Sequence, residues 1–166
     1  MEALSAAGRA HMIAASAPFA SCGLTWTHIS DAGVAPRERL ENVMPLQRDA
    51  RVVVVDDDTF FVEAMLVLLP QLGLAPVACA MDGAEAIAVV REHDPDVVLV
   101  DLEMPHVDGV EAIKEISRTS PNTTLLAVTG STDPQRAADA VAAGALACLS
   151  KTEVRERLEA LIAQDS

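Results

Sequence analysis

From residue 51 onward, short apolar runs alternate with longer stretches in which apolar residues recur at helical spacing. The apolar runs are typical of strands buried on both faces, and they lie at Val52–Val55, Pro76–Ala80, Val97–Val100, Leu125–Val128 and Ala145–Leu149. The stretches between them predict amphipathic helices, at Thr59–Leu72, Gly83–His93, Gly109–Arg118, Pro134–Ala143 and Thr152–Ala163. Five such units predict an α/β fold, a doubly wound sandwich with helices on both sides of a parallel sheet.

Residues between the predicted elements support these boundaries. Asp82 and Asp108 are placed to cap the second and third helices, and Asp133 stands before a proline that suits the first helical turn. Gly73 and Gly144 fall where the first and fourth helices are expected to stop.

The composition changes near residue 50. Residues 1–49 hold 5 acids and 4 bases, whereas the remainder holds 20 acids and 8 bases. The first segment shows no sustained period, and only Pro36 to Met44 favours a helix. We therefore predict that residues 50–166 form one folded domain. Residues 1–49 are expected to be an N-terminal extension that is either disordered or the result of a start site placed too far upstream, since Met44 is itself a natural start.

Composition and charge exclude several classes of function. The net charge of −13 argues against nucleic-acid binding, which needs basic patches. No apolar run approaches the roughly 18–20 residues of a membrane span. The cysteines, Cys22, Cys79 and Cys148, lack metal-ligand spacing. We interpret them as reduced thiols and expect a cytoplasmic protein.

Polar residues follow four of the five predicted strands. Asp56 and Asp57 follow the first strand, Asp101 the third, Thr129 the fourth and Lys151 the fifth. Because ligands of such folds bind at the carboxyl ends of the strands, these side chains are expected to meet at one edge of the sheet. Three carboxylates, a hydroxyl and an ammonium group suit a divalent cation together with a phosphoryl group.

This set of residues resembles the receiver domain of response regulators in two-component signalling. The shared motifs are an acidic pair after the first strand, D-x-x-M-P-x-x-D-G from Asp101, then T-G and K. The separations are also similar: 44 residues from Asp57 to Asp101, 28 to Thr129 and 22 more to Lys151. The resemblance covers about residues 50–166. It implies a flavodoxin-like (βα)5 fold with strand order 2-1-3-4-5.

The resemblance implies a role for each site residue. Asp101 would be the phosphoacceptor, which attacks a phosphohistidine of a sensor histidine kinase or phosphotransfer protein. Lys151 would pair with the phosphoryl group, and the Thr129 hydroxyl would bond to it.

A metal site is implied as well. Asp57 would bind Mg²⁺ directly and Asp56 through water, while Asp101 and the backbone carbonyl of Glu103 would complete the protein ligands. The neighbouring Asp58 is interpreted as an N-cap of the first helix, a role for which Thr59 competes.

The sequence departs from the family at two positions. Thr152 follows the lysine where the family usually has proline, so a trans peptide bond is expected. Cys148 stands at the switch position, where the family usually has an aromatic residue. We therefore expect the signal to leave through the loop at Gly130 and Ser131 and through the fourth helix, rather than through Cys148.

An enzyme of the haloacid-dehalogenase phosphatase type is the alternative. Asp56 and Asp58 match its D-x-D motif, but Phe60 stands where threonine or valine is expected, and Asp101 has no required role there. A non-signalling structural module is a third possibility. The receiver interpretation predicts no enzymatic activity beyond slow self-dephosphorylation. It also predicts signalling through a downstream protein target with no DNA-binding domain, since the chain ends at Ser166. His93 and His106 are expected to be solvent-exposed loop residues.

Overall fold

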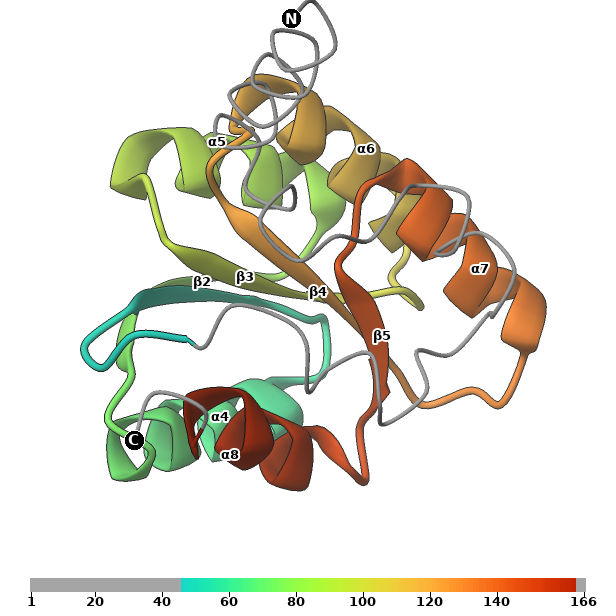
Figure 1. The fold of residues 1–166 in the computed structure, drawn as a ribbon. Helices are drawn as coiled ribbons and strands as arrows, with labels where there is room; N and C mark the ends of the chain where they lie inside the picture. Colours follow the sequence, from blue (N-terminus) through green and yellow to red (C-terminus); the bar gives the residue numbers. More distant parts are fainter. Residues whose placement is uncertain (1–45, 164–166) are drawn as a thin grey trace, which may run out of the picture.

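The structure is a computed structural model that describes residues 46–163. It contains a five-stranded, wholly parallel sheet in the order β2-β1-β3-β4-β5 (Figure 1). The strands are β1 (Arg51–Val55), β2 (Ala75–Ala80), β3 (Val97–Asp101), β4 (Thr124–Thr129) and β5 (Ala147–Ser150). The helices are α4 (Thr59–Gln71), α5 (Gly83–His93), α6 (Gly109–Thr119), α7 (Pro134–Ala143) and α8 (Val154–Ala163). The predicted doubly wound fold and strand order are confirmed.

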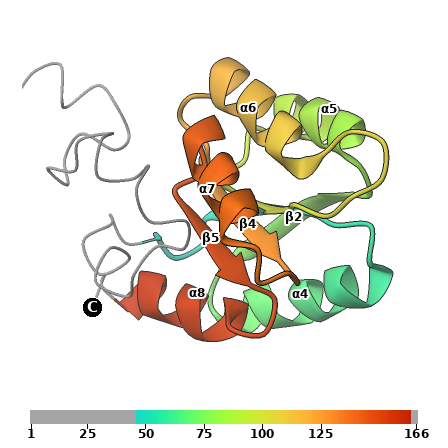
Figure 2. The same cartoon turned by 90° about the vertical axis from the view of Figure 1, so that its right-hand side faces the viewer.

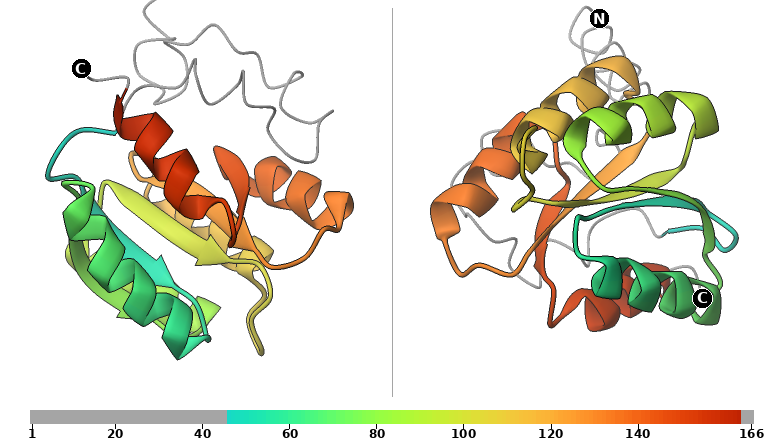
Figure 3. Two further views of the ribbon diagram at one scale, coloured as in Figure 1. Left: turned by 90° about the horizontal axis from the view of Figure 1, so that it is seen from below. Right: turned by 180° about the vertical axis from the view of Figure 1, so that it is seen from behind.

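Helices cover both faces of the sheet. Helices α5, α6 and α7 lie on one face, and α4 and α8 lie on the other (Figures 1 and 2). Figure 3 shows α4 and α8 from below, packed across the sheet. Successive residues of the buried strands therefore face different cores: Val52 and Val54 join the α4/α8 cluster, while Val53 and Val55 join the α5/α6/α7 cluster. Burial on both faces explains the continuous apolar runs in the sequence.

The helix caps follow the sequence closely. The Asp58 carboxylate accepts hydrogen bonds from the backbone N–H groups of Phe60 and Phe61, so Asp58, and not Thr59, caps α4. Three further aspartates, Asp82, Asp108 and Asp133, cap α5, α6 and α7 in the same way. Gly144 ends α7 with φ +127°, and Gly73 follows α4 with φ +75°. These positive φ values favour glycine.

Two predicted boundaries near the C-terminus are wrong. Strand β5 begins at Ala147, not Ala145, because the Ala145 N–H still bonds to the Ala140 carbonyl and closes α7. Helix α8 begins at Val154, not Thr152, because a turn precedes it. In that turn the Ser150 hydroxyl lies 2.8 Å from the Thr152 hydroxyl, and Glu153 N–H donates to the Ser150 carbonyl.

Three further predictions concerned the N-terminal extension, the cysteines and membrane-spanning segments. The extension up to residue 45, which includes Cys22 and the helix predicted at Pro36 to Met44, lies outside the described residues. Cys79 and Cys148 are free thiols, as expected. None of the helices between residues 46 and 163 is long and apolar enough to cross a membrane.

Candidate functional site

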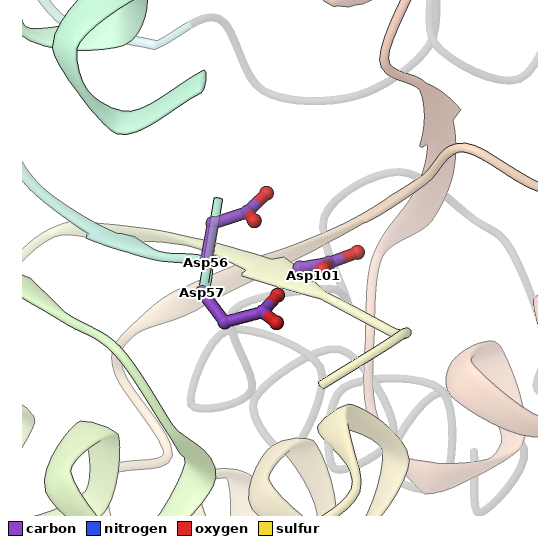
Figure 4. A group of neighbouring side chains, drawn as sticks. All are labelled: Asp56, Asp57 and Asp101. Atoms are coloured by element: carbon purple, nitrogen blue, oxygen red, sulfur yellow. The ribbon is translucent and has the colours of Figure 1, made fainter. Parts of the chain in front are cut away.

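Three aspartates gather at the carboxyl edge of the sheet. Asp56 directly follows β1, and Asp101 is the last residue of the neighbouring strand β3. One carboxylate oxygen from each of Asp56, Asp57 and Asp101 lies within 4.8 Å of the others. Figure 4 shows the three side chains turned towards a common space. The convergence predicted from the sequence is therefore present.

The three carboxylates differ in exposure and in their contacts. Asp56 is fully buried and Asp101 is 2% exposed, whereas Asp57 is exposed. Asp56 Oδ1 accepts a hydrogen bond from the Asp58 N–H at 2.8 Å, and Asp101 Oδ1 accepts one from the Glu103 N–H at 3.2 Å. These short-range bonds fix the direction of both buried side chains at the ends of their strands.

The environment of Asp101 disfavours its charged form. Burial, followed by the negative charge of Asp56, raises the pKa of Asp101 from its ordinary value of 3.8 to about 6. The Glu103 N–H and the charge of Lys151 act in the opposite direction and offset part of this shift. Such a perturbed carboxyl group at the edge of a parallel sheet is typical of a functional site.

Lys151 supplies the positive charge of the site. It follows β5, where its N–H donates to the Thr129 carbonyl at 2.9 Å. Its Nζ lies 2.7 Å from Asp56 Oδ2 and 3.6 Å from Asp101 Oδ2. Among the described residues, Asp56 Oδ2 has no hydrogen-bond donor apart from this ion pair. Burial alone lowers the pKa of Lys151, but the bond to Asp56 and the acidic charges raise it above its ordinary value.

Phe61 is a site residue that sequence reasoning missed. Its ring lies beneath the ammonium group of Lys151, with Nζ 4.7 Å from the ring centroid. This is a cation–π contact, which stabilises the charged form of the lysine. The chain has three phenylalanines, and two of them, Phe60 and Phe61, follow the acidic run after a single threonine. That proximity was the only signal for Phe61 in the sequence.

The donor set fits a hard divalent cation. Three carboxylates with oxygens in mutual reach, one of them buried beside a single lysine, concentrate more negative charge than Lys151 neutralises. Oxygen ligands of this kind suit Mg²⁺ or Ca²⁺. Glu103 lies two residues beyond Asp101, in the loop after β3, and its backbone carbonyl stays a predicted further ligand.

Thr129 is connected to α7 by a relay of hydrogen bonds. It is 7% exposed and lies one residue beyond Val128, the partner of Asp101 in the pairing of β3 with β4. The Thr129 hydroxyl accepts the Ser131 N–H at 2.9 Å. The Ser131 hydroxyl accepts the Asp133 N–H, and the Asp133 carboxylate accepts the Gln135 N–H at the start of α7.

Cys148 lies inside the α5/α6/α7 core. It is 3% exposed and pairs with Ala127 in the register of β4 with β5. Burial raises the pKa of its thiol to about 11, so the thiol stays protonated at neutral pH. The side chain behaves as a small apolar core residue.

The two histidines have different surroundings. His93 lies in the last turn of α5 and is half-buried, with Nδ1 3.1 Å from the Val89 carbonyl, so its prediction as an exposed loop residue is wrong. Because His93 still belongs to the helix, its ring lies close to the backbone carbonyl one turn earlier. His106 is an exposed loop residue, as predicted. The described residues contain no cis peptide bond, so the bond before Thr152 is trans, also as predicted.

Comparison with known proteins gives the family. Residues 52–163 match the response regulator receiver domain. The chain belongs to this family. A protein-glutamate methylesterase/protein-glutamine glutaminase from Nitrosospira multiformis is 41% identical over 104 residues, which are 60% of this chain and 29% of that protein. The chain thus spans less than a third of the methylesterase's length.

Two further relatives agree with the receiver fold. The chemotaxis protein CheY of Bacillus subtilis is 34% identical over 95 residues, which cover 57% of this chain and 79% of CheY. The response regulator domain of Thermotoga maritima CheB superposes with a TM-score of 0.63 at 28% identity. That match covers 70% of this chain and 96% of the other. The receiver belongs to two-component systems and is CheY-like.

Proposed function

We propose that this receiver is a phosphoacceptor that takes a phosphoryl group from a histidine kinase or a phosphotransfer protein onto Asp101. The observation that carries the proposal is the position of Asp101: a buried carboxylate at the sheet edge, flanked by two acids and 3.6 Å from Lys151 Nζ. This grouping supports a metal-assisted phosphoryl transfer rather than an ordinary structural ion pair.

The transfer is a substitution at phosphorus. A carboxylate oxygen of Asp101 attacks the phosphorus of a phosphohistidine, a P–O bond forms, and the P–N bond breaks as the imidazole leaves. Asp57, Asp56 through water, Asp101 and the Glu103 carbonyl would hold Mg²⁺, whose charge would neutralise the phosphoryl oxygens. Metal binding would also lower the pKa of Asp101 and keep it ionised for attack.

Lys151 and Thr129 would stabilise the product. Lys151 Nζ, already beside Asp101, would turn towards the new phosphoryl oxygens, and the Thr129 hydroxyl would donate to one of them. The Thr129 hydroxyl now accepts the Ser131 N–H. Its movement would therefore release or pull the loop that leads into α7. The output would be contact with another protein, in a cytoplasmic signalling pathway, with no enzymatic activity beyond slow self-dephosphorylation.

The phosphatase alternative requires Asp56 as nucleophile and Asp58 as the second acid. Asp56 is fully buried, and its two oxygens face the Asp58 N–H and Lys151 Nζ. The Asp58 carboxylate accepts two backbone N–H groups as the cap of α4. Both oxygens of Asp56 are thus engaged at 2.7–2.8 Å, whereas the nearest cation to Asp101 Oδ2 is Lys151 Nζ at 3.6 Å, and this difference favours Asp101 as the nucleophile.

Intact-mass spectrometry tests the proposal. In Mg²⁺ with a small phosphodonor, the wild-type protein should gain one phosphoryl group, and Asp101→Asn should gain none. Asp94→Asn, a change to an exposed aspartate that ends α5, is the matched control and should be labelled like wild type. Undiminished labelling of Asp101→Asn, with Asp56 as the modified residue, would favour the phosphatase instead.

A further inference from the structure

Arg136 on α7 reaches across to the loop after β3. Its Nη1 donates to Asp108 Oδ2 at 2.7 Å, and its Nη2 donates to Asp108 Oδ1 at 3.1 Å. Nη2 also donates to the backbone carbonyl of Leu102. One guanidinium group on α7 therefore bonds to Asp108, 28 positions earlier in the sequence, and to Leu102, 34 positions earlier. Sequence reasoning had no signal for this contact.

Leu102 lies between two residues of the proposed site, the phosphoacceptor Asp101 and the metal ligand Glu103. Asp101 precedes it, and Glu103 follows it. The Leu102 side chain is fully buried, and its N–H donates to the Val128 carbonyl at 3.0 Å. With Arg136 on its carbonyl, both backbone groups of Leu102 are engaged, one by β4 and one by α7. The direction of the chain between Asp101 and Glu103 is fixed accordingly.

The other partner of Arg136 packs against the same stretch of backbone. Asp108 Oδ1 accepts the Val110 N–H and so caps α6. The next residue, Gly109, lies directly against the end of β3: a Cβ there would come 2.8 Å from Leu102 Cα and would also overlap the Asp101 carbonyl. The loop from Leu102 to Gly109 thus folds back on itself, and Arg136 bonds to both ends of it.

We propose that Arg136 is a positioning residue that clamps the loop from Leu102 to Gly109, and through it sets the placement of Asp101 and of the Glu103 carbonyl. The inference rests on the proposed phosphoacceptor function and adds α7 as the element that holds the phosphorylation site in shape. The same helix is joined to Thr129 through Ser131 and Asp133. Helix α7 is therefore connected to the ends of two strands of the site: to β3 through Arg136 and Leu102, and to β4 through the loop that starts at Thr129.

An isolated surface ion pair would not have this effect. The side chains of Arg136 and Asp108 are 33% and 42% exposed, and exposed pairs contribute little on their own. The contact to the Leu102 carbonyl distinguishes Arg136, because a planar guanidinium can bond to a carboxylate and a carbonyl at once. A lysine has one charged nitrogen and cannot reproduce that arrangement.

Arg136→Gln, Arg136→Lys and wild type form the test series. Arg118→Gln is the matched control, since Arg118 makes a comparable two-pronged pair with Glu115 on α6, away from the loop. Hydrogen exchange of the amides of residues 102–110 is measured without metal, and the dissociation constant for Mg²⁺ is measured by calorimetry. Phosphorylation by a small phosphodonor is followed by intact mass.

In Arg136→Gln we expect faster exchange at residues 102–110 and an Mg²⁺ dissociation constant raised roughly 10-fold to 100-fold, as for other residues that orient metal ligands. Arg136→Lys should lie between Gln and wild type, and Arg118→Gln should match wild type. A wild-type protein labelled at Asp101, with exchange and Mg²⁺ affinity unchanged in Arg136→Gln, would overturn this inference alone. A wild-type protein that is never labelled would overturn the proposed function and this inference together.

Should Arg136→Gln fail to fold, Asp108→Asn gives a second measurement. Asparagine keeps the cap of α6 but removes the charge that holds the guanidinium. Faster exchange at residues 102–110 in Asp108→Asn would support the clamp. Exchange equal to wild type would contradict it.

Discussion

Lys151 Nζ lies 2.7 Å from Asp56 Oδ2, a carboxylate oxygen that is wholly buried. The lysine side chain is 22% exposed, so the pair is largely removed from water. Without metal, Lys151 therefore offsets the charge that the acidic cluster accumulates at the sheet edge. Removing it would leave Asp56 buried without a cation beside it, which is costly in a protein interior.

Lys151→Ala should consequently destabilise the metal-free protein by about 2–4 kcal/mol. Added Mg²⁺ should recover part of that loss, because a cation near Asp57 also neutralises the cluster. Urea unfolding with chelator and with Mg²⁺ measures both effects. The matched control is Lys114→Ala, at the other lysine of the sequence, which is exposed. Equal stability of the two variants in chelator would contradict the role given to Lys151.

The raised pKa of Asp101 leads to a second prediction, which concerns how the free energy of unfolding depends on pH. The pKa of this carboxyl is raised to about 6 in the folded protein, chiefly by burial, against an ordinary value of 3.8. The folded state therefore holds the proton at pH values where the unfolded chain has lost it. The resulting stabilisation is complete below about pH 4 and is lost as the pH rises through 6.

Asp101→Asn removes this titration. In chelator the variant should match wild type below about pH 4 and exceed it by about 1–3 kcal/mol above pH 7. Urea unfolding at several pH values checks the prediction, with Asp94→Asn as the control aspartate. A difference between Asp101→Asn and wild type that stays constant from pH 4.5 to 8 would show that Asp101 does not titrate as described.

The N-terminal boundary leads to a third prediction. Leu46 and Ala50 are each 7% exposed, and the Leu46 N–H donates to the Leu161 carbonyl on α8. The packed domain thus includes residues from Leu46 onward. We propose that residues 1–43 are dispensable for folding. A variant starting at Met44 should melt within a few degrees of the full chain.

A shorter variant sharpens this test. Starting at Arg51 removes Leu46 and Ala50 from the α4/α8 core and should cost about 2–5 kcal/mol, as for other large deletions from a core. Calorimetric melting of the three lengths separates the possibilities. A loss of several kcal/mol on removing residues 1–43 alone would show that these residues pack onto the receiver.

The sequence predicted most of the site because its signals are local. Asp56 and Asp101 end apolar strands, and a parallel sheet brings the ends of its strands to one edge. Asp58 lies one residue before the first helix, where capping requires little knowledge of the rest of the fold. Each of these predictions depended on residues near in the sequence and on one general rule of topology.

The remaining contacts depend on packing between distant segments. Arg136 meets Asp108 because α7 lies beside the loop after β3. No periodicity or residue spacing in the sequence specifies how α7 is placed against that loop. Phe61 meets Lys151 because α4 and the β5–α8 turn approach at the same edge. Helix α8 starts two residues later than predicted because the Ser150 and Thr152 hydroxyls bond to one another. Local side-chain hydrogen bonds of this kind compete with helix formation.

Thr129 gives the last prediction, which concerns the route of the signal. Its hydroxyl accepts the Ser131 N–H, and the relay continues through Asp133 to the start of α7. Thr129→Ala should leave phosphorylation of Asp101 possible while abolishing the response of residues 129–143 to beryllofluoride, measured by hydrogen exchange. Thr129→Ser keeps the hydroxyl and should respond like wild type.

Cys148 provides the contrast within the same experiment. The thiol is buried, protonated and too small to expose or bury much surface by rotating. Cys148→Ala should therefore retain the beryllofluoride response at residues 129–143, at a cost in stability of about 1 kcal/mol for the lost sulfur. Because Thr129 and Cys148 lie on neighbouring strands, the two variants distinguish a route through the loop from one through β5. Protection that changes around Cys148 and stays constant at residues 129–143 would place the switch on β5 and contradict the route through α7.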